Sequence, residues 1–328
     1  MARRNDVSDA DVARAARPNA VADPGPGVET DPWGATQPQG SLAAPVVPTG
    51  TGARARRWRA ALGLLLRSLS ALVGLLITLF WVVCAIFWPL IVPYSPDSQD
   101  YNAILVEPSR AHLFGTDNFG RDVFSRVLAG SREVLLQAPT ITAIGLLGGI
   151  LIGLLTAYYG GWFDEVVGRV MDAFIAFPTI ILALLVLAIL GPSQLNVILV
   201  IAIAYIPLTG RVVRSAALSV RDLDYVSAAR LRGARGPVVM VTEILPNILG
   251  PIIVEGTVRI GYAIFATASL SFIGLGIPGS TNWGAMISDT RLYLSRDPAI
   301  VLAPALAIAS LVVALNLFAD GLRRAEQA

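Results

Sequence analysis

The sequence predicts an all-α integral membrane protein with six transmembrane helices and both termini in the cytoplasm. Hydrophobic residues make up 55% of the 328 residues and charged residues only 15%, whereas soluble domains carry about 25% charged residues. The apolar residues gather in runs, and a helix needs roughly 20 mostly apolar residues to cross a bilayer. Arginines collect on one side of the predicted spans, which sets the orientation.

Residues 1–55 are expected to form a disordered cytoplasmic tail ahead of the membrane domain, residues 56–328. The tail is rich in Ala, Pro, Gly, Asp and Arg and has no periodic apolar pattern. It therefore buries too little surface to offset the entropy of ordering. It does not resemble a signal peptide, because no apolar core promptly follows its start.

Six apolar segments are the predicted spans. They cover residues 68–92, 134–158, 174–190, 195–213, 248–273 and 299–318. The second span holds Gly145, Gly149 and Gly153, which are spaced four residues apart and so share one helix face. That face either lets another helix approach closely or simply reflects how common glycine is in membrane helices.

The placement of arginine predicts which side of the membrane each loop occupies. A cluster of arginines between residues 54 and 67 precedes the first span. With six spans, the same side receives the polar segment near residue 225 and the C-terminus, both of which hold further arginines. The opposite side is poorer in arginine, and cytoplasmic loops carry the arginine excess in membrane proteins.

The residue inventory excludes several chemistries. The basic residues are all arginine, which rules out a P-loop lysine, a lysine Schiff base and a Ser-x-x-Lys nucleophile. One cysteine, Cys84, and one histidine, His112, cannot build a disulfide framework or a Cys/His zinc site. We therefore expect no catalytic residue, no metal site and no cofactor in this chain, and no nucleic-acid partner.

A polar segment, residues 214–247, separates the fourth and fifth spans. Ala229 and Gly233 lie four residues apart, so they are expected to share a small-residue helix face that fits a groove on another protein. A Gly-Pro pair at 236–237 is expected to interrupt this helix, and Pro246 to stand where the next span begins. The prediction is a docking element held rigidly to a membrane helix; the alternative is a solvated loop.

This segment resembles the EAA loop of ABC-importer permeases, in which Glu-Ala-Ala and a later glycine precede Leu-Pro. Here the pattern reads Ser227-Ala228-Ala229, then Gly233, then Leu-Pro. The resemblance implies that the loop forms coupling helices that dock in a cleft of an ATP-binding subunit. The coupling residues that it implies are Tyr225, Ser227, Ala228, Ala229, Gly233, Leu245 and Pro246.

The likeness extends over roughly residues 60–328. The stretch HLFGTDNFGRDVFSRVLAGSR at 112–132 resembles the C-type permease of dipeptide, oligopeptide and nickel importers, as do ASLSFIGLGIPGSTNWGAMI and NLFADGLR near the end. This resemblance implies a type I permease fold in the bacterial inner (plasma) membrane. It also implies a second, B-type permease, two subunits that bind ATP and Mg²⁺, and an external solute-binding protein. Peptides are the expected solute, with nickel or another small solute as the alternative.

The chain departs from the family pattern at Ser227 and Thr267, where an acidic residue is usual, and at Glu243, where a histidine is often found. The remaining motif positions fit, so we expect the docking loop to be retained. Inside the fifth span, Glu255 and Arg259 lie four residues apart and can pair. They either line the translocation path or the interface with the partner permease, or form a structural ion pair between helices.

Two segments on the other side of the membrane could receive the binding protein or close the end of the bundle. GTDNFGRD, residues 115–122, is dense in turn-forming residues and is expected to be a cap, with its aspartates paired to arginines. In GSTNWGAM, residues 279–286, Asn282 and Trp283 are the candidate residues for binding-protein docking.

The resemblance implies alternating access, in which this chain contributes a coupling free energy between its docking loop and the pore. Two other classes remain open. A self-contained secondary transporter predicts several functional charges in the spans, or paired broken helices. A membrane-embedded enzyme needs a convergent set of His, Cys, Asp or Glu in the spans, which are nearly bare of these residues.

Overall fold

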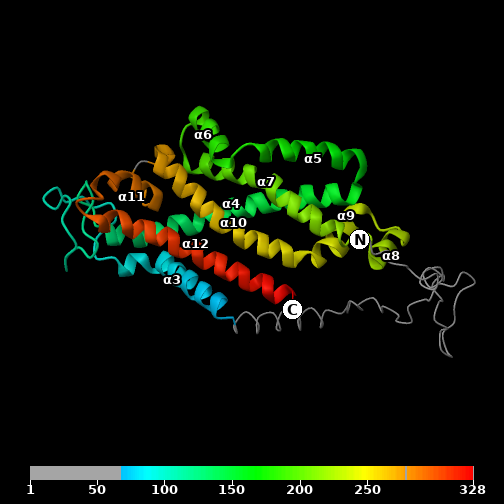
Figure 1. Cartoon of the computed structure of the whole chain (residues 1–328), viewed down its shortest axis with the longest axis horizontal. Helices are drawn as coiled ribbons and strands as arrows, with labels where there is room; N and C mark the ends of the chain where they lie inside the picture. The colour runs from blue at the N-terminus through cyan, green and yellow to red at the C-terminus, as the bar shows by residue number, and fades with distance from the viewer. Residues whose placement is uncertain (1–67, 278, 328) are drawn as a thin grey trace, which may run out of the picture. The chain divides into compact units, whose positions relative to one another are not determined.

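The computed structural model describes residues 68–277 and 279–327, and the regular structure of this part is helical (Figure 1). The predicted tail, residues 1–55, lies outside the described residues. Within them, five helices are long and apolar enough to cross a membrane. In chain order these are α3 (Leu69–Ile91), α4 (Val123–Tyr159), α7 (Gln194–Leu218), α10 (Leu249–Leu270) and α12 (Pro298–Gln327).

The third predicted span, residues 174–190, is not one helix. Helices α5 (Gly161–Ala176) and α6 (Thr179–Leu190) meet at an angle of 83°, and the pair counts as a sixth span only when taken together. Pro178 causes the break because it disfavours a helical backbone at the residue before it, and Phe177 is extended, with φ −86° and ψ 128°. Helix α6 has 12 residues and covers only about 18 Å.

Helix α4 begins well before residue 134, where the second span was predicted to start. The carboxylate of Asp122 caps its first turn by accepting hydrogen bonds from the Ser125 N–H at 2.8 Å and the Ser125 hydroxyl at 2.7 Å. The helix has 37 residues and is about 55 Å long. It therefore exceeds the roughly 30 Å apolar core of a bilayer and projects beyond it.

Helices α4 and α7 lie against each other along the glycine face of α4. A Cβ added at Gly145 would stand 2.8 Å from the Cβ of Tyr205, and one at Gly153 would stand 2.7 Å from a carbonyl oxygen of α7. At Gly149 it would overlap the hydroxyl of Thr209. That hydroxyl donates to the carbonyl of Gly145 at 3.0 Å. The prediction that these glycines allow a close helix approach is confirmed.

The apolar core joins all five long helices. Buried side chains in one cluster come from each of them, for example Trp81, Ile141, Ile201, Ile264 and Leu311. Helix α10 packs on α12 and α4, and α3 packs on α12. Helix α5 leaves most of its side chains exposed, whereas α6 packs on α7 and α10 and contributes Ala183 and Leu187 to the core. The fold therefore consists of a packed set of long helices with a bent pair beside it.

Candidate functional site: a docking loop, a buried ion pair and a closed end

The polar segment after α7 folds into short helices at one end of the bundle, which we call the α8 end (Figure 1). The elements are α8 (Asp224–Leu231), α9 (Gly236–Val239), a π-helical turn η1 (Met240–Ile244) and a 3₁₀ turn η2 (Leu245–Asn247). The break lies ahead of Gly236. The Gly-Pro pair begins the second helix instead of ending the first, because proline fits a first helical turn. From α9 the chain runs through η1 and η2 into α10 without a further loop.

Helix α8 is anchored by two buried side chains, one of which, Ala229, was predicted to lie on its docking face. Val226 is 0% exposed and Ala229 is 1% exposed. Both belong to an apolar cluster with residues of α4 and α7 and with the buried Ile244 of η1. Ala229 therefore packs inward, where a larger side chain would have no space, and it does not face a partner.

Gly233 ends α8 and does not extend its face. Its φ of 78° is left-handed, its N–H donates to the carbonyl of Arg230 at 2.9 Å, and the N–H of Ala234 donates to the carbonyl of Ala229 at 3.2 Å. These two bonds form a Schellman motif, which favours glycine at this position. The predicted helix face shared by Ala229 and Gly233 is therefore wrong, because the helix ends at Leu231.

The outward face of α8 consists of Asp224, Ser227, Ala228 and Leu231, which follow helical spacing. Leu231 is 89% exposed, an unusual position for a large apolar side chain on an otherwise polar loop. Ser227 and Ala228 are half-buried and small, so they leave a shallow surface beside it. On this face of α8, the exposed side chain of Leu231 protrudes next to the two small residues Ser227 and Ala228.

The remaining predicted coupling residues support this element from behind. Tyr225, Leu245 and Pro246 are half-buried, and Tyr225 and Leu245 pack against the apolar cluster under α8. Burial, together with the nearby carboxylate of Glu243, raises the pKa of the Tyr225 phenol. Tyr225 therefore stays neutral at physiological pH and serves as a packing residue.

Replacing Gly233 by valine should loosen the turn between α8 and α9. A left-handed backbone costs a β-branched residue about 1–2 kcal/mol, although a Cβ at this position would meet no other atom within 4 Å. Gly233→Asn should be tolerated, because asparagine also adopts this conformation. Limited trypsin digestion checks this, since arginines flank the turn: the valine variant should be cut faster there and the asparagine variant at the wild-type rate. Equal rates for all three chains would contradict the prediction.

Glu255 and Arg259 form an ion pair within α10. The Nε of Arg259 donates to Oε1 of Glu255 at 2.6 Å, and the two side chains are 16% and 11% exposed, respectively. The guanidinium also lies 5.5 Å from the ring centroid of Tyr205 on α7 and 5.8 Å from that of Tyr262. The pair stands about 15 Å along α10 from its start, near the middle of the helix. The predicted ion pair therefore forms, within one helix, and its guanidinium also contacts a ring of α7.

The segment of residues 115–122 folds as a cap at the opposite end, which we call the α11 end. Asp117 accepts hydrogen bonds from the Arg121 Nε at 2.7 Å and from two backbone N–H groups. Asp122, which was expected to pair with an arginine, instead accepts from Ser125 and lies 2.9 Å from Nδ1 of His112. The His112 ring in turn stacks on Tyr94. These contacts fix the cap from within.

The segment that begins at residue 279 is held to helix α4 by two hydrogen bonds. The Arg126 guanidinium donates to the carbonyl of Ser280 at 2.8 Å. Thr281 donates to the carboxylate of Glu133 at 3.3 Å. Arg126 and Glu133 were not singled out from the sequence, although their seven-residue spacing puts both on one face of α4. Their partners lie about 150 residues away, where sequence spacing carries no information.

Asn282 and Trp283 are structural residues and not a docking surface. Trp283 is 0% exposed, and its indole N–H donates to the carbonyl of Val127 at 2.9 Å. Asn282 is 3% exposed, and its side chain caps helix α11 (Trp283–Thr290) by accepting from the Gly284 N–H at 2.9 Å. Side chains buried this deeply cannot touch a binding protein, so their predicted docking role is wrong. Among the described residues, no group of three or more His, Cys, Asp or Glu is placed to hold a metal ion.

The arrangement is that of a multi-pass membrane protein: long apolar helices, one polar loop joined directly to a span, and a folded cap at the opposite end. Residues 149–326 match the family described as the binding-protein-dependent transport system inner membrane component. Residues 56–108 match the N-terminal transmembrane domain of oligopeptide transport permease C. The chain belongs to this family of inner-membrane permeases of ABC importers. The predicted all-α permease fold, importer function and inner-membrane location are thereby confirmed.

Curated relatives and a solved structure agree with this assignment. The chain is 40% identical over 270 residues to the dipeptide transport system permease protein DppC of Alkalihalophilus pseudofirmus, covering 82% of this chain and 88% of the relative. It is 38% identical over 270 residues to the glutathione transport system permease protein GsiD of Pectobacterium atrosepticum, covering 82% and 90%. The inward-facing MetNI methionine ABC transporter matches with a TM-score of 0.51 at 18% identity, over 62% of this chain and 95% of that chain. This last similarity supports the fold alone.

Proposed function

We propose that this chain is the C-type permease of a peptide importer, with the α8 end and both termini in the cytoplasm. It pairs with a second, B-type permease to enclose the translocation path. Two ATP-binding subunits hold ATP and Mg²⁺, and a binding protein delivers the peptide at the α11 end. The relatives described above carry names of dipeptide and glutathione permeases, which supports a peptide solute. The chain performs no catalysis itself.

One observation carries the coupling role: the docking helix packs against a segment that runs directly into the helix of the ion pair. Helix α8 is fixed by its buried side to η1, and η1 runs through η2 directly into α10. A force on the outward face of α8 therefore reaches the helix that carries Glu255 and Arg259. Closure of the ATP-binding subunits would shift α10 and change access to the path. Allosteric couplings of this kind are typically about 1–3 kcal/mol.

The docking face makes the proposal testable by co-purification from native membranes in mild detergent. Leu231→Glu places a charge on the outward face of α8 and leaves the buried residues of this helix unchanged. Leu292, which is 81% exposed near the α11 end, offers a matched control as Leu292→Glu. We expect the wild type and Leu292→Glu to retain both the second permease and the ATP-binding subunits. Leu231→Glu should lose the ATP-binding subunits alone.

Two results would contradict the proposal. If Leu231→Glu retains the ATP-binding subunits, the outward face of α8 is not the docking face. If no subunit accompanies the wild type, and the purified chain alone moves peptide into liposomes, the chain works as a self-contained transporter.

A further inference from the structure

The half of α10 that is nearer the α11 end carries a row of accessible side chains, which we call the stripe. Tyr262 and Phe265 are exposed on it and Ser269 is half-buried, and Phe272 is exposed on the π-helical turn η3 (Ser271–Leu275) that follows α10. The neighbouring positions of α10 are packed against other helices of the bundle. Arg259 lies at the inner end of the stripe, so a single helix presents an arginine at mid-depth and aromatic rings further toward the α11 end.

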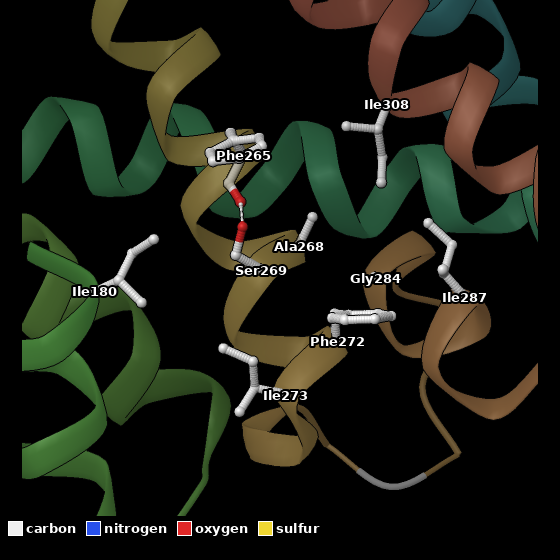
Figure 2. A pocket seen from close by; sticks show the side chains of 9 residues that line it. All are labelled: Ile180, Phe265, Ala268, Ser269, Phe272, Ile273, Gly284, Ile287 and Ile308. Atoms are coloured by element: carbon white, nitrogen blue, oxygen red, sulfur yellow. Dashed lines mark hydrogen bonds between the residues drawn. The ribbon is translucent and has the colours of Figure 1, made fainter. Parts of the chain in front are cut away.

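An apolar pocket opens on the outer part of this stripe (Figure 2). Its volume is about 460 Å³, and its lining comes from four helices. Phe265 and Ser269 come from α10 and Phe272 from the turn η3 that follows it, and Ile180 of α6 stands across from them. The only hydrogen bond drawn there runs from the Ser269 hydroxyl to the carbonyl of Phe265, at 2.8 Å. No polar group is therefore aimed into the pocket for a partner, and it suits an apolar side chain.

The guanidinium of Arg259 has binding capacity that the fold does not use. Among the described residues, its hydrogen bonding is limited to the bond from Nε to Glu255. Tyr205 and Tyr262 flank the group by their rings, which leaves its two terminal nitrogens without a hydrogen-bond acceptor. A guanidinium fork matches a carboxylate in a bidentate geometry, and such charge-assisted bonds are strong away from bulk water.

The spacing of the two features fits a short peptide. Along the α10 axis, Phe265 lies about 9 Å and Ser269 about 15 Å from Arg259. An extended chain covers roughly 3.3–3.6 Å per residue, so three or four residues span this distance. An apolar partner helix or a lipid tail could fill the pocket, but neither would supply an acceptor for the terminal nitrogens of Arg259. A peptide satisfies both features at once.

We propose that Arg259 binds the C-terminal carboxylate of the transported peptide, while the pocket at Phe265 and Phe272 receives an apolar side chain near the other end of that peptide. Glu255 holds the guanidinium in position. This inference rests on the proposed function, since it requires a peptide in the path. It assigns this chain a share of solute selection that the binding protein does not supply.

The test uses the complete importer, with all subunits, in proteoliposomes that contain ATP on the cytoplasmic side. The probes are Phe-Ala-Ala and its C-terminal amide, both radiolabelled. The variant combines Glu255→Gln with Arg259→Gln, which removes both charges together and keeps a possible hydrogen bond between two polar side chains. The matched control combines Glu165→Gln with Arg169→Gln, an exposed pair of the same spacing on α5.

We expect the wild type and the control to transport the free acid at least about tenfold faster than the amide, as loss of a charge-assisted bond predicts. In the Glu255→Gln, Arg259→Gln variant the two rates should agree within about twofold. The same binding protein serves every sample, so a change in this ratio arises in the permease. Co-purification of the second permease with the variant checks that assembly is intact.

Other outcomes overturn the inference. An unchanged acid-to-amide ratio in the variant, or equal transport of both probes by the wild type, shows that Arg259 does not bind the carboxylate. Loss of the second permease from the variant assigns the ion pair to the interface between permeases. A wild-type importer that hydrolyses ATP but transports neither probe refutes the proposed peptide function, and this inference falls with it.

Discussion

Trp283→Ala should destabilise the folded chain by about 3–5 kcal/mol, the usual effect of removing a large buried aromatic side chain. The Trp283 ring is fully buried, stands 4.9 Å from the ring centroid of Trp81, and donates its N–H to Val127. Its removal leaves a cavity between α3, α4 and α11 and an unpaired carbonyl. Thermal unfolding of the purified chain in detergent measures the loss. Leu292→Ala, an exposed position near the same end, should unfold with the wild type.

The same Trp283→Ala variant also separates a structural role from a docking role. If Trp283 contacted the binding protein, the variant would keep its thermal stability and lose only the stimulation of ATP hydrolysis by the binding protein. We expect the reverse order: stability falls first, and any loss of stimulation follows the fraction of unfolded chain. Wild-type stability in Trp283→Ala would restore the docking interpretation.

Gly149→Ala should destabilise the chain by about 3 kcal/mol, at the upper end for overpacking. The added methyl group would overlap Thr209 and approach the backbone N of Gly210 to 2.8 Å, so α4 and α7 would have to separate. Gly168 provides the control, because a Cβ there would meet no atom within 4 Å. Gly168→Ala in α5 should leave stability unchanged or raise it by about 0.5–1 kcal/mol. Thermal unfolding that is identical for Gly149→Ala and the wild type would show that the helices do not pack as described.

Hydropathy predicted the long helices because a bilayer-spanning helix needs a long apolar run, and α3, α7, α10 and α12 each contain one. It failed at Pro178, where the apolar run continues through a backbone break. The residue before a proline avoids helical conformation, and that local rule outweighs hydropathy. It also missed the first turns of α4, whose polar residues, such as Arg126, are buried by contacts with distant loops.

The polar loop folds into short helices between two spans, as the sequence predicted, but its outward face was not predicted correctly. Ala229 and Gly233 have helical spacing, and nothing in that spacing shows that the helix has already ended. The glycine near the end of the pattern, next to arginines, was itself an indication of a helix C-terminus. Ser227 and Ala228 were included in the predicted set and do face outward, whereas Leu231 was not included.

The attachments of α10 restrict the kind of motion that it can make. At the α8 end it continues into η1 and η2, which are fixed by the cluster around Ile244. At the α11 end its last turn touches α11, where a Cβ on Gly284 would overlap the carbonyl of Ala268, and α11 is fixed to α4 through Trp283. A helix that is fixed at both ends cannot translate along its own axis. The motion left to it is a sideways bend, which displaces the middle of the helix most. Arg259 lies near the middle of α10. A small movement of the polar loop would therefore displace α10 most at Arg259, where we propose that the solute is held.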